Sequence, residues 1–158
     1  MQFVHKTIRL SCDLNRAFRF LTRPEMIGKW SGSEAQVELK TSGVYILSNS
    51  ESGFTTENSK ILDYEREKHL HILWKDSEHT SEDFDLLIRI MPCRSDTEFC
   101  AELHLLFKHN SRALTDGETT FYSEYFENLL ESLRLYQNKD WVIQDSELTM
   151  SWLKGSSL

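Results

Sequence analysis

The ten residues from Leu21 to Trp30, "LTRPEMIGKW", are the stretch that best indicates the fold of this chain. The segment before them has apolar residues at helical spacing, and Asp13 or Asn15 can cap its start, which predicts a first short helix. Pro24 disfavours helical geometry at Arg23, yet its fixed φ suits the first turn of a new helix. After the proline, one helical face is made by Met26, Ile27 and Trp30. The stretch therefore predicts two short helices joined by a corner.

Patterns of period two, which are typical of strands, dominate most of the remaining chain. One such run precedes the helices, at residues 3–11. Six follow them, at residues 35–40, 44–49, 56–65, 69–75, 84–93 and 98–109. In the last run, the residues predicted to face the core are Phe99, Ala101, Leu103, Leu105 and Phe107. Because short connections join neighbours in antiparallel sheets, we expect the six later strands to form a meander.

The last strong pattern is a long helix over residues 117–139. Its apolar face consists of Tyr122, Phe126, Leu129, Leu133 and Tyr136. Because the strands offer one apolar face and this helix another, helix and sheet should bury each other. We predict one α+β domain over residues 1–138, with the order β-α-α-β-β-β-β-β-β-α.

Length, charge and composition limit the classes of function. A chain of 158 residues fits one domain. Its net charge of −7 opposes nucleic acid and anionic membranes, which require clustered Lys and Arg. No apolar run approaches the roughly 20 residues that span a bilayer, and the N-terminus lacks the order of a secretory signal. We therefore expect a cytoplasmic protein with no nucleic-acid partner and no membrane span.

Four segments carry a resemblance to a known family: residues 17–30, 42–47, 61–74 and 122–136. They read "AFRFLTRPEMIGKW", "SGVYIL", "ILDYEREKHLHILW" and "YSEYFENLLESLRLY". In this order they resemble a helix with a Thr-x-Pro-Glu corner and Trp, a Gly-Gly-x-aromatic strand start, a strand pair with Leu-x-x-x-Trp, and a closing helix. These are the motifs of the family named for the activator of the heat-shock protein 90 ATPase, within the START-like, helix-grip superfamily (SRPBCC, birch-pollen-allergen-like). The resemblance covers about residues 8–136.

The chain departs from the family pattern at four positions. Arg66 and Glu67 stand where the family usually has prolines. Ser42 stands in place of a second glycine, and Phe126 in place of a Trp.

The resemblance implies a curved antiparallel sheet that wraps around the long C-terminal helix. An apolar cavity that holds a lipid or another hydrophobic ligand often lies between the two. The family name implies an alternative, a chaperone accessory that contacts the heat-shock protein 90 ATPase. A cyclase-type enzyme that uses the same cavity is the second alternative, because enzymes also occur on this fold.

In such a fold, six large side chains are candidates for lining the ligand cavity: Trp30, Tyr45, Trp74, Leu103, Phe126 and Leu130. The other interpretation is that they only fill the core, since aromatic side chains bury large areas. Core packing is the preferred interpretation, with some of these residues serving both roles. The leading functional prediction is a non-enzymatic domain that binds a hydrophobic small molecule, or a protein partner, through this cavity and its mouth.

A metal site or catalytic site finds little support in the sequence. His69 and His71 share one face of a strand, where Asp63 or Glu65 could complete a metal site. The alternation places both imidazoles on the outer face, so we expect no metal ion and no cofactor. Catalysis on this fold needs an acid or base inside the cavity, but the inward faces are nearly all apolar and no GxSxG, HExxH or phosphate-binding glycine loop is present. We therefore expect that the protein is not an enzyme.

The three cysteines, Cys12, Cys93 and Cys100, show no metal-ligand spacing. Cys93 and Cys100 flank a polar turn and could face each other across a hairpin. A disulfide requires a narrow geometry and an oxidising compartment, so we expect reduced thiols.

The extension over residues 139–158 matches no part of the family pattern. Asp145 or Ser146 can cap a short extra helix that ends near Gly155. The run at residues 141–143 is too apolar for a chain end that is fully exposed to solvent. We expect the extension to pack on its own domain, and docking on a second copy or on a protein partner is the alternative.

Overall fold

The computed structural model describes the backbone of residues 2–93 and 99–155, and the side chains of this part as far as Gln137. The elements are β1 (Val4–Leu10), α1 (Leu14–Thr22), α2 (Pro24–Ser31), β2 (Glu34–Val37), β3 (Tyr45–Ser48), β4 (Lys60–Glu65), β5 (His69–Trp74), β6 (Phe84–Pro92), β7 (Ala101–His109) and α3 (Asp116–Gly155). Their order confirms the predicted α+β fold with a curved antiparallel sheet and a C-terminal helix.

The strands form two sheets, where the sequence predicted one meander after the helices. Five strands pair antiparallel in the order β1-β7-β6-β5-β4, so the meander is confirmed from β4 to β7. β2 and β3 form a separate two-stranded ribbon, and an isolated bridge between Val44 and Lys60 connects it to β4. Helix α2 contacts both β2 and α3, so it packs between this ribbon and the long helix.

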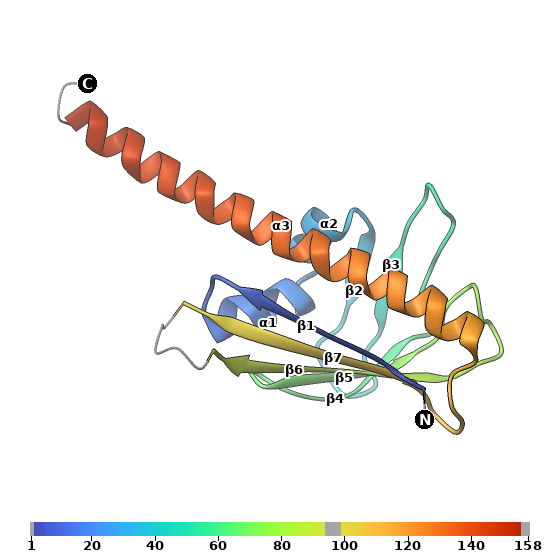
Figure 1. Cartoon of the computed structure of the whole chain (residues 1–158). Coiled ribbons are helices and arrows are strands. Elements are labelled where there is room, and N and C mark those ends of the chain that lie inside the picture. The colour runs from blue at the N-terminus through green and yellow to red at the C-terminus, as the bar shows by residue number, and fades with distance from the viewer. Residues whose placement is uncertain (1, 94–98, 156–158) are drawn as a thin grey trace.

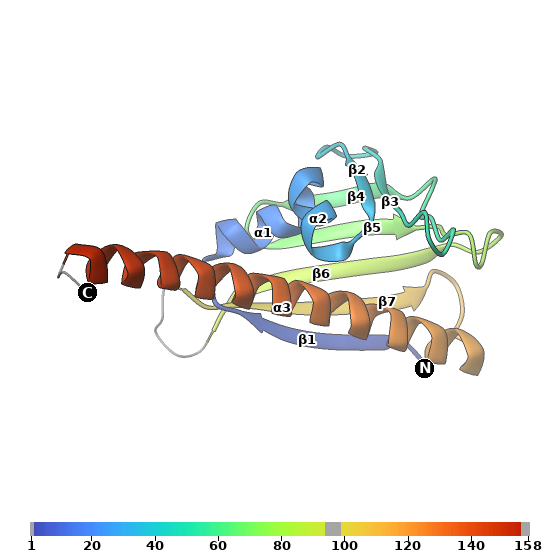
Figure 2. The ribbon, with the colours of Figure 1, turned by 90° about the horizontal axis from the view of Figure 1, so that it is seen from above.

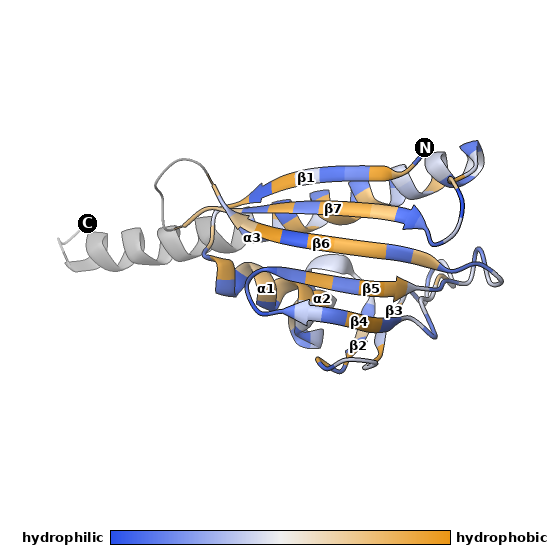
Figure 3. Cartoon of the chain, turned by 90° about the horizontal axis from the view of Figure 1, so that it is seen from below, coloured by the Kyte–Doolittle hydropathy of each residue, from blue (hydrophilic) through white to orange (hydrophobic). Residues whose placement is uncertain are grey.

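All three helices lie on the same side of the five-stranded sheet (Figure 1). Seen from above, α3 lies over β1, β7 and β6, while α1 and α2 lie beside it over the β5 and β4 side (Figure 2). Figure 3 shows the opposite face of the sheet, where hydrophobic and hydrophilic residues alternate along the strands. The inner residues of this alternation pack against the helices as one hydrophobic core.

Phe99 is an exception to the predicted alternation of the last strand. It precedes the first residue of β7, Ala101, and its side chain is 66% exposed. The prediction that it faces the core is wrong, because the ladder between β6 and β7 ends at the pair Pro92 and Ala101.

The corner predicted from "LTRPEMIGKW" is confirmed. Asp13 caps α1 by accepting a 2.7 Å hydrogen bond from the backbone N–H of Arg16. Arg23 ends α1 and precedes α2 with extended backbone angles, as expected for a residue before proline. The indole N–H of Trp30 donates a 2.8 Å hydrogen bond to the carbonyl of Phe20, which ties the second helix back to the first.

Cys93 and Cys100 form a disulfide, so the prediction of reduced thiols is wrong for this pair. The antiparallel register explains why: it pairs Pro92 with Ala101, and the next opposed pair is the two cysteines, whose Cα atoms are 5.4 Å apart. Cys12 is a free, buried thiol, and burial raises its pKa to about 12. A thiol of this kind is not a nucleophile at neutral pH.

The C-terminal helix α3 continues without a break to Gly155, where the sequence predicted a separate short helix after residue 139. The packing of this extension on the domain, on a second copy or on a partner remains a prediction, because it lies outside the residues whose side chains are described. Within the described part of the chain, no helix has the length and apolar character needed to cross a membrane.

Candidate functional site

The six residues predicted to line a cavity come from five elements and lie in one core. Trp30 is in α2, Tyr45 in β3, Trp74 in β5, Leu103 in β7, and Phe126 and Leu130 in α3. All six side chains are buried, and the rings of Trp74 and Phe126 meet at a centroid distance of 5.4 Å. All six belong to the same hydrophobic core. Their role in binding a ligand remains a prediction.

The polar atoms of the aromatic residues in this set are bonded inside the protein. Tyr45 donates a 2.6 Å hydrogen bond from its hydroxyl to the carbonyl of Leu21, and burial raises the pKa of this phenol. Trp74 donates a 2.7 Å hydrogen bond from its indole N–H to Asp76. These bonds satisfy buried donors and hold the rings in fixed orientations.

A pocket of about 200 Å³, here called the mouth, opens between α3 and the segments around the β2–β3 ribbon. Its lining consists of Ser31, Ser33, Asn49, Ser52, Phe54, Tyr125, Asn128, Leu129 and Ser132. The rim is made of neutral hydroxyl and amide groups, whereas the aromatic residues Phe54 and Tyr125 contribute apolar surface. A ligand that fits this lining is uncharged and has an apolar or aromatic body.

Aromatic contacts lead from the mouth into the core. The rings of Phe54 and Tyr125 are 4.9 Å apart, and Tyr125 is 6.0 Å from Trp74 and 5.1 Å from Phe126. Two of the predicted cavity residues, Trp74 and Phe126, therefore lie directly behind a wall of the mouth. Burial, together with the charge of Asp76, raises the pKa of Tyr125 and keeps its phenol protonated at neutral pH.

A buried carboxylate, Asp76, lies in the loop after β5 and was not singled out from the sequence. It accepts hydrogen bonds from the indole of Trp74 at 2.7 Å, the hydroxyl of Tyr122 at 2.5 Å, and the backbone N–H groups of Glu78 and His79 at 2.9 and 3.0 Å. Four donors compensate the desolvation of the charge.

The same hydroxyl of Tyr122 lies 2.7 Å from Nδ1 of His79. The phenol oxygen, whose proton is directed to Asp76, accepts a hydrogen bond from this nitrogen in the tautomer that carries a proton on Nδ1. Burial, followed by the hydrogen bond to Asp76, raises the pKa of Tyr122. The arrangement is a closed internal network that joins α3 to the loop after β5.

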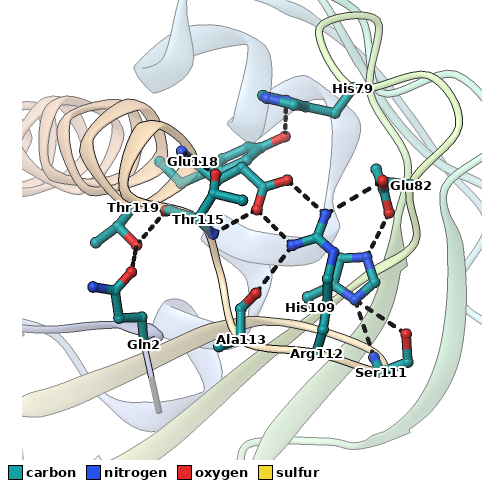
Figure 4. A network of polar contacts seen from close by, with 11 residues as sticks. Gln2, His79, Glu82, His109, Ser111, Arg112, Ala113, Thr115, Glu118 and Thr119 are labelled. Atoms are coloured by element: carbon teal, nitrogen blue, oxygen red, sulfur yellow. Dashed lines mark hydrogen bonds and ion pairs between the residues drawn. The ribbon is translucent and has the colours of Figure 1, made fainter.

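A second polar network surrounds the start of α3 (Figure 4). Arg112 donates hydrogen bonds of 2.8 and 3.0 Å to the two carboxylate oxygens of Glu118, and it pairs with Glu82 at 3.3 Å. Thr115 and Glu118 also form a capping box, because each side chain accepts a hydrogen bond from the backbone N–H of the other. The spacing Thr115-x-x-Glu118 is a sequence signal that could have located this helix start.

The two histidines considered for a metal site, His69 and His71, each have their own acidic partner. Nε2 of His69 lies 3.0 Å from Asp63, and Nε2 of His71 lies 3.1 Å from Asp85. Among the described residues, no group of three or more His, Cys, Asp or Glu side chains is arranged to hold a metal ion.

The order of elements, the sheet wrapped around α3 and the aromatic interior define a START-like, helix-grip (SRPBCC) domain. Residues 11–137 match the family described as activator of Hsp90 ATPase homolog 1-like protein, and the chain belongs to this family. A comparison with curated proteins finds no match.

Solved structures share the fold at low sequence identity. PFC0360w, an HSP90 activator from Plasmodium falciparum, is 16% identical with a TM-score of 0.66, and the match covers 87% of this chain and 97% of that one. The Aha1 dimer from Colwellia psychrerythraea gives 12% identity and a TM-score of 0.64, with 85% and 94% coverage. DynU16, from the dynemicin biosynthetic locus, gives 10% identity and a TM-score of 0.73. The match covers 87% of this chain but only 48% of DynU16, about half of its length.

Proposed function

We propose that this protein is a non-enzymatic binding domain for an uncharged small molecule with an apolar or aromatic body. The ligand enters through the mouth and contacts Tyr125, with Trp74 and Phe126 behind it. The observation that carries the proposal is the combination of a neutral polar rim with aromatic rings that continue from the mouth into the core.

The chemistry of the lining supports binding without catalysis. The described residues around the mouth include no carboxylate, imidazole or amine, and the only phenol, Tyr125, has a raised pKa. The acid and base groups nearest to the aromatic interior, Asp76 and His79, are engaged with Tyr122. A cyclase-type reaction would need one of these groups to face the substrate.

The proposal is tested by titrating the protein with N-phenyl-1-naphthylamine, a neutral fluorescent probe. Ser132 is exposed on α3 at the rim, so Ser132→Phe should fill the mouth and weaken probe binding at least about tenfold without a cost to folding. Glu124→Phe, on an exposed position of the same helix, is the matched control. Equal binding by both variants, or no binding by the native protein, would contradict the proposal. Native mass spectrometry of the purified protein then looks for a bound apolar ligand.

A second candidate function is contact with the Hsp90 ATPase, which the family description suggests. The observation that favours it is an apolar groove of about 480 Å³ on the outer face of the sheet, where Phe3 is 50% and Met91 40% exposed beside Leu87 and Leu106. A change in the ATPase rate of purified Hsp90 on addition of this protein, lost in Met91→Glu, would support it. An unchanged rate would exclude it.

A further inference from the structure

Three arginines line one pocket at the corner between α1 and α2. The pocket has a volume of about 450 Å³ and is separate from the mouth. Arg19 comes from the last turn of α1, Arg23 from the corner itself, and Arg66 from the turn between β4 and β5. The two helices lie over the β4 and β5 side of the sheet, which brings these distant segments together (Figure 2).

These arginines differ from three other arginines of the described part of the chain in lacking close acidic partners. Arg9, Arg112 and Arg134 each pair with a glutamate within 3.3 Å. By contrast, Arg23 has only a 4.0 Å contact with Glu25, between two side chains that are more than half exposed.

Arg19 and Arg66 make no ion pair with a carboxylate in the part of the chain whose side chains are described. Nε of Arg19 is buried and has no hydrogen-bond partner there. The positive charge of Arg19 therefore has no carboxylate in this part of the chain to compensate it, and an anion bound in the pocket would supply that compensation.

We propose that this pocket binds a phosphate monoester. A dianionic phosphate offers several acceptor oxygens to converging guanidinium groups, which match its geometry with paired N–H donors. Pro24 and Leu39, which are partly buried, line the same pocket beside the buried Phe18 and can contact an apolar group attached to the phosphate. The carboxylate of Glu67 is the single acidic group of the lining and opposes the anion.

Arg66 and Glu67 stand where the family usually has prolines, so this chain places two charged side chains in the lining of the pocket at these positions. The backbone of Glu67 has φ 66°, which a proline cannot adopt. The turn that carries Arg66 to the pocket therefore has a geometry that a proline at residue 67 would exclude.

Isothermal titration calorimetry with the full chain tests the proposal, using inorganic phosphate, phenyl phosphate and phenol as probes. Phenyl phosphate should bind, while phenol should not. Arg23→Ala and Arg66→Ala should each weaken binding about tenfold or more. Glu67→Gln should strengthen it, because it removes the opposing charge. Lys108→Ala, which removes one exposed positive charge from β7, is the control and should leave the affinity unchanged.

Vesicles of phosphatidylcholine with and without phosphatidic acid distinguish a lipid headgroup from a free phosphate ester as the source of the phosphate. Binding to either source with the same dependence on Arg66 supports the site. Equal affinity of Arg66→Ala and Lys108→Ala, or no binding of any phosphate probe, would overturn it. Arg19→Met, which keeps an unbranched stem of similar length and removes the charge, provides a further variant whose fold is checked by circular dichroism. Binding of the neutral probe at the mouth should be unaffected by Arg66→Ala, so the two proposals can fail independently.

Discussion

The hydroxyl of Tyr122 donates a 2.5 Å hydrogen bond to the buried carboxylate of Asp76, which joins the long helix to the loop after β5. The same carboxylate accepts the indole N–H of Trp74, so one charged group organises a helix, a loop and a strand.

Replacing Asp76 by Ala should strongly destabilise the fold. The substitution leaves the donors of Trp74, Tyr122 and two backbone N–H groups without their acceptor, at a cost of ~3 kcal/mol or more. Tyr122→Phe removes only one of the four donors and should cost less, about 1–2 kcal/mol. Urea unfolding followed by circular dichroism measures both. Similar free energies of unfolding for Asp76→Ala and the native protein would show that the network contributes nothing.

The stability of the protein should fall in acid partly through Glu118. The hydrogen bonds from Arg112, and then those from Thr115, hold the pKa of this carboxyl at about 2, below its ordinary value of 4.5. The ionised pair therefore stabilises the folded state fully at pH values above the pKa that Glu118 has in the unfolded chain. This stabilisation is lost as pH falls from about 5 towards 2.

The variant Glu118→Gln tests this pH dependence. It should be less stable than the native protein at neutral pH, and the difference should shrink on acidification. Urea unfolding at several pH values between about 6 and 3 measures the difference. A difference that stays constant over this range would show that ionisation of Glu118 is not coupled to folding.

Reduction of the Cys93–Cys100 disulfide should lower the free energy of unfolding by ~2 kcal/mol, as expected for closure of a short loop. The two cysteines are seven residues apart. The double variant Cys93→Ser/Cys100→Ser should show the same decrease in the free energy of unfolding, and dithiothreitol should not lower the stability of this variant further. Thiol titration of the denatured, unreduced protein should find one thiol per chain, from Cys12. Three thiols would contradict the disulfide.

Substitutions of Ser42 and Gly43, two adjacent residues before β3, should change the stability of the protein in opposite directions. Ser42 has φ 65°, a strained conformation for a residue with a side chain, and it stands where the family usually has glycine. Ser42→Gly should therefore stabilise the protein by ~0.5–1 kcal/mol.

Gly43→Ala should have the opposite effect. An added Cβ would lie 2.0 Å from the carbonyl oxygen of Glu38, so the backbone must move, at a cost of ~3 kcal/mol. Thermal unfolding compares the two variants. Equal stability of Gly43→Ala and the native protein would show that this close approach is easily relaxed.

Much of the architecture could be predicted from the sequence because it depends on local patterns. The proline rule placed the corner at Arg23 and Pro24, and alternation located the strands, although several predicted strands extend beyond the observed ends. The six predicted cavity residues are all buried in one core, since hydrophobic periodicity indicates the buried face of a strand or helix. Phe99 was misplaced, because the pattern alone does not show where a ladder ends.

Only the tertiary structure determined the contacts between residues that are distant in sequence. Asp76 contacts Tyr122, which is 46 positions away in the sequence. Arg66 lies in the turn between β4 and β5, yet it lines the same pocket as Arg19 and Arg23 of the helical corner. The separation of the β2–β3 ribbon from the main sheet and the meeting of Cys93 with Cys100 also depend on strand pairing. Hydrophobic periodicity determines which face of an element is buried, whereas the polar groups that meet there are set by how the elements pack.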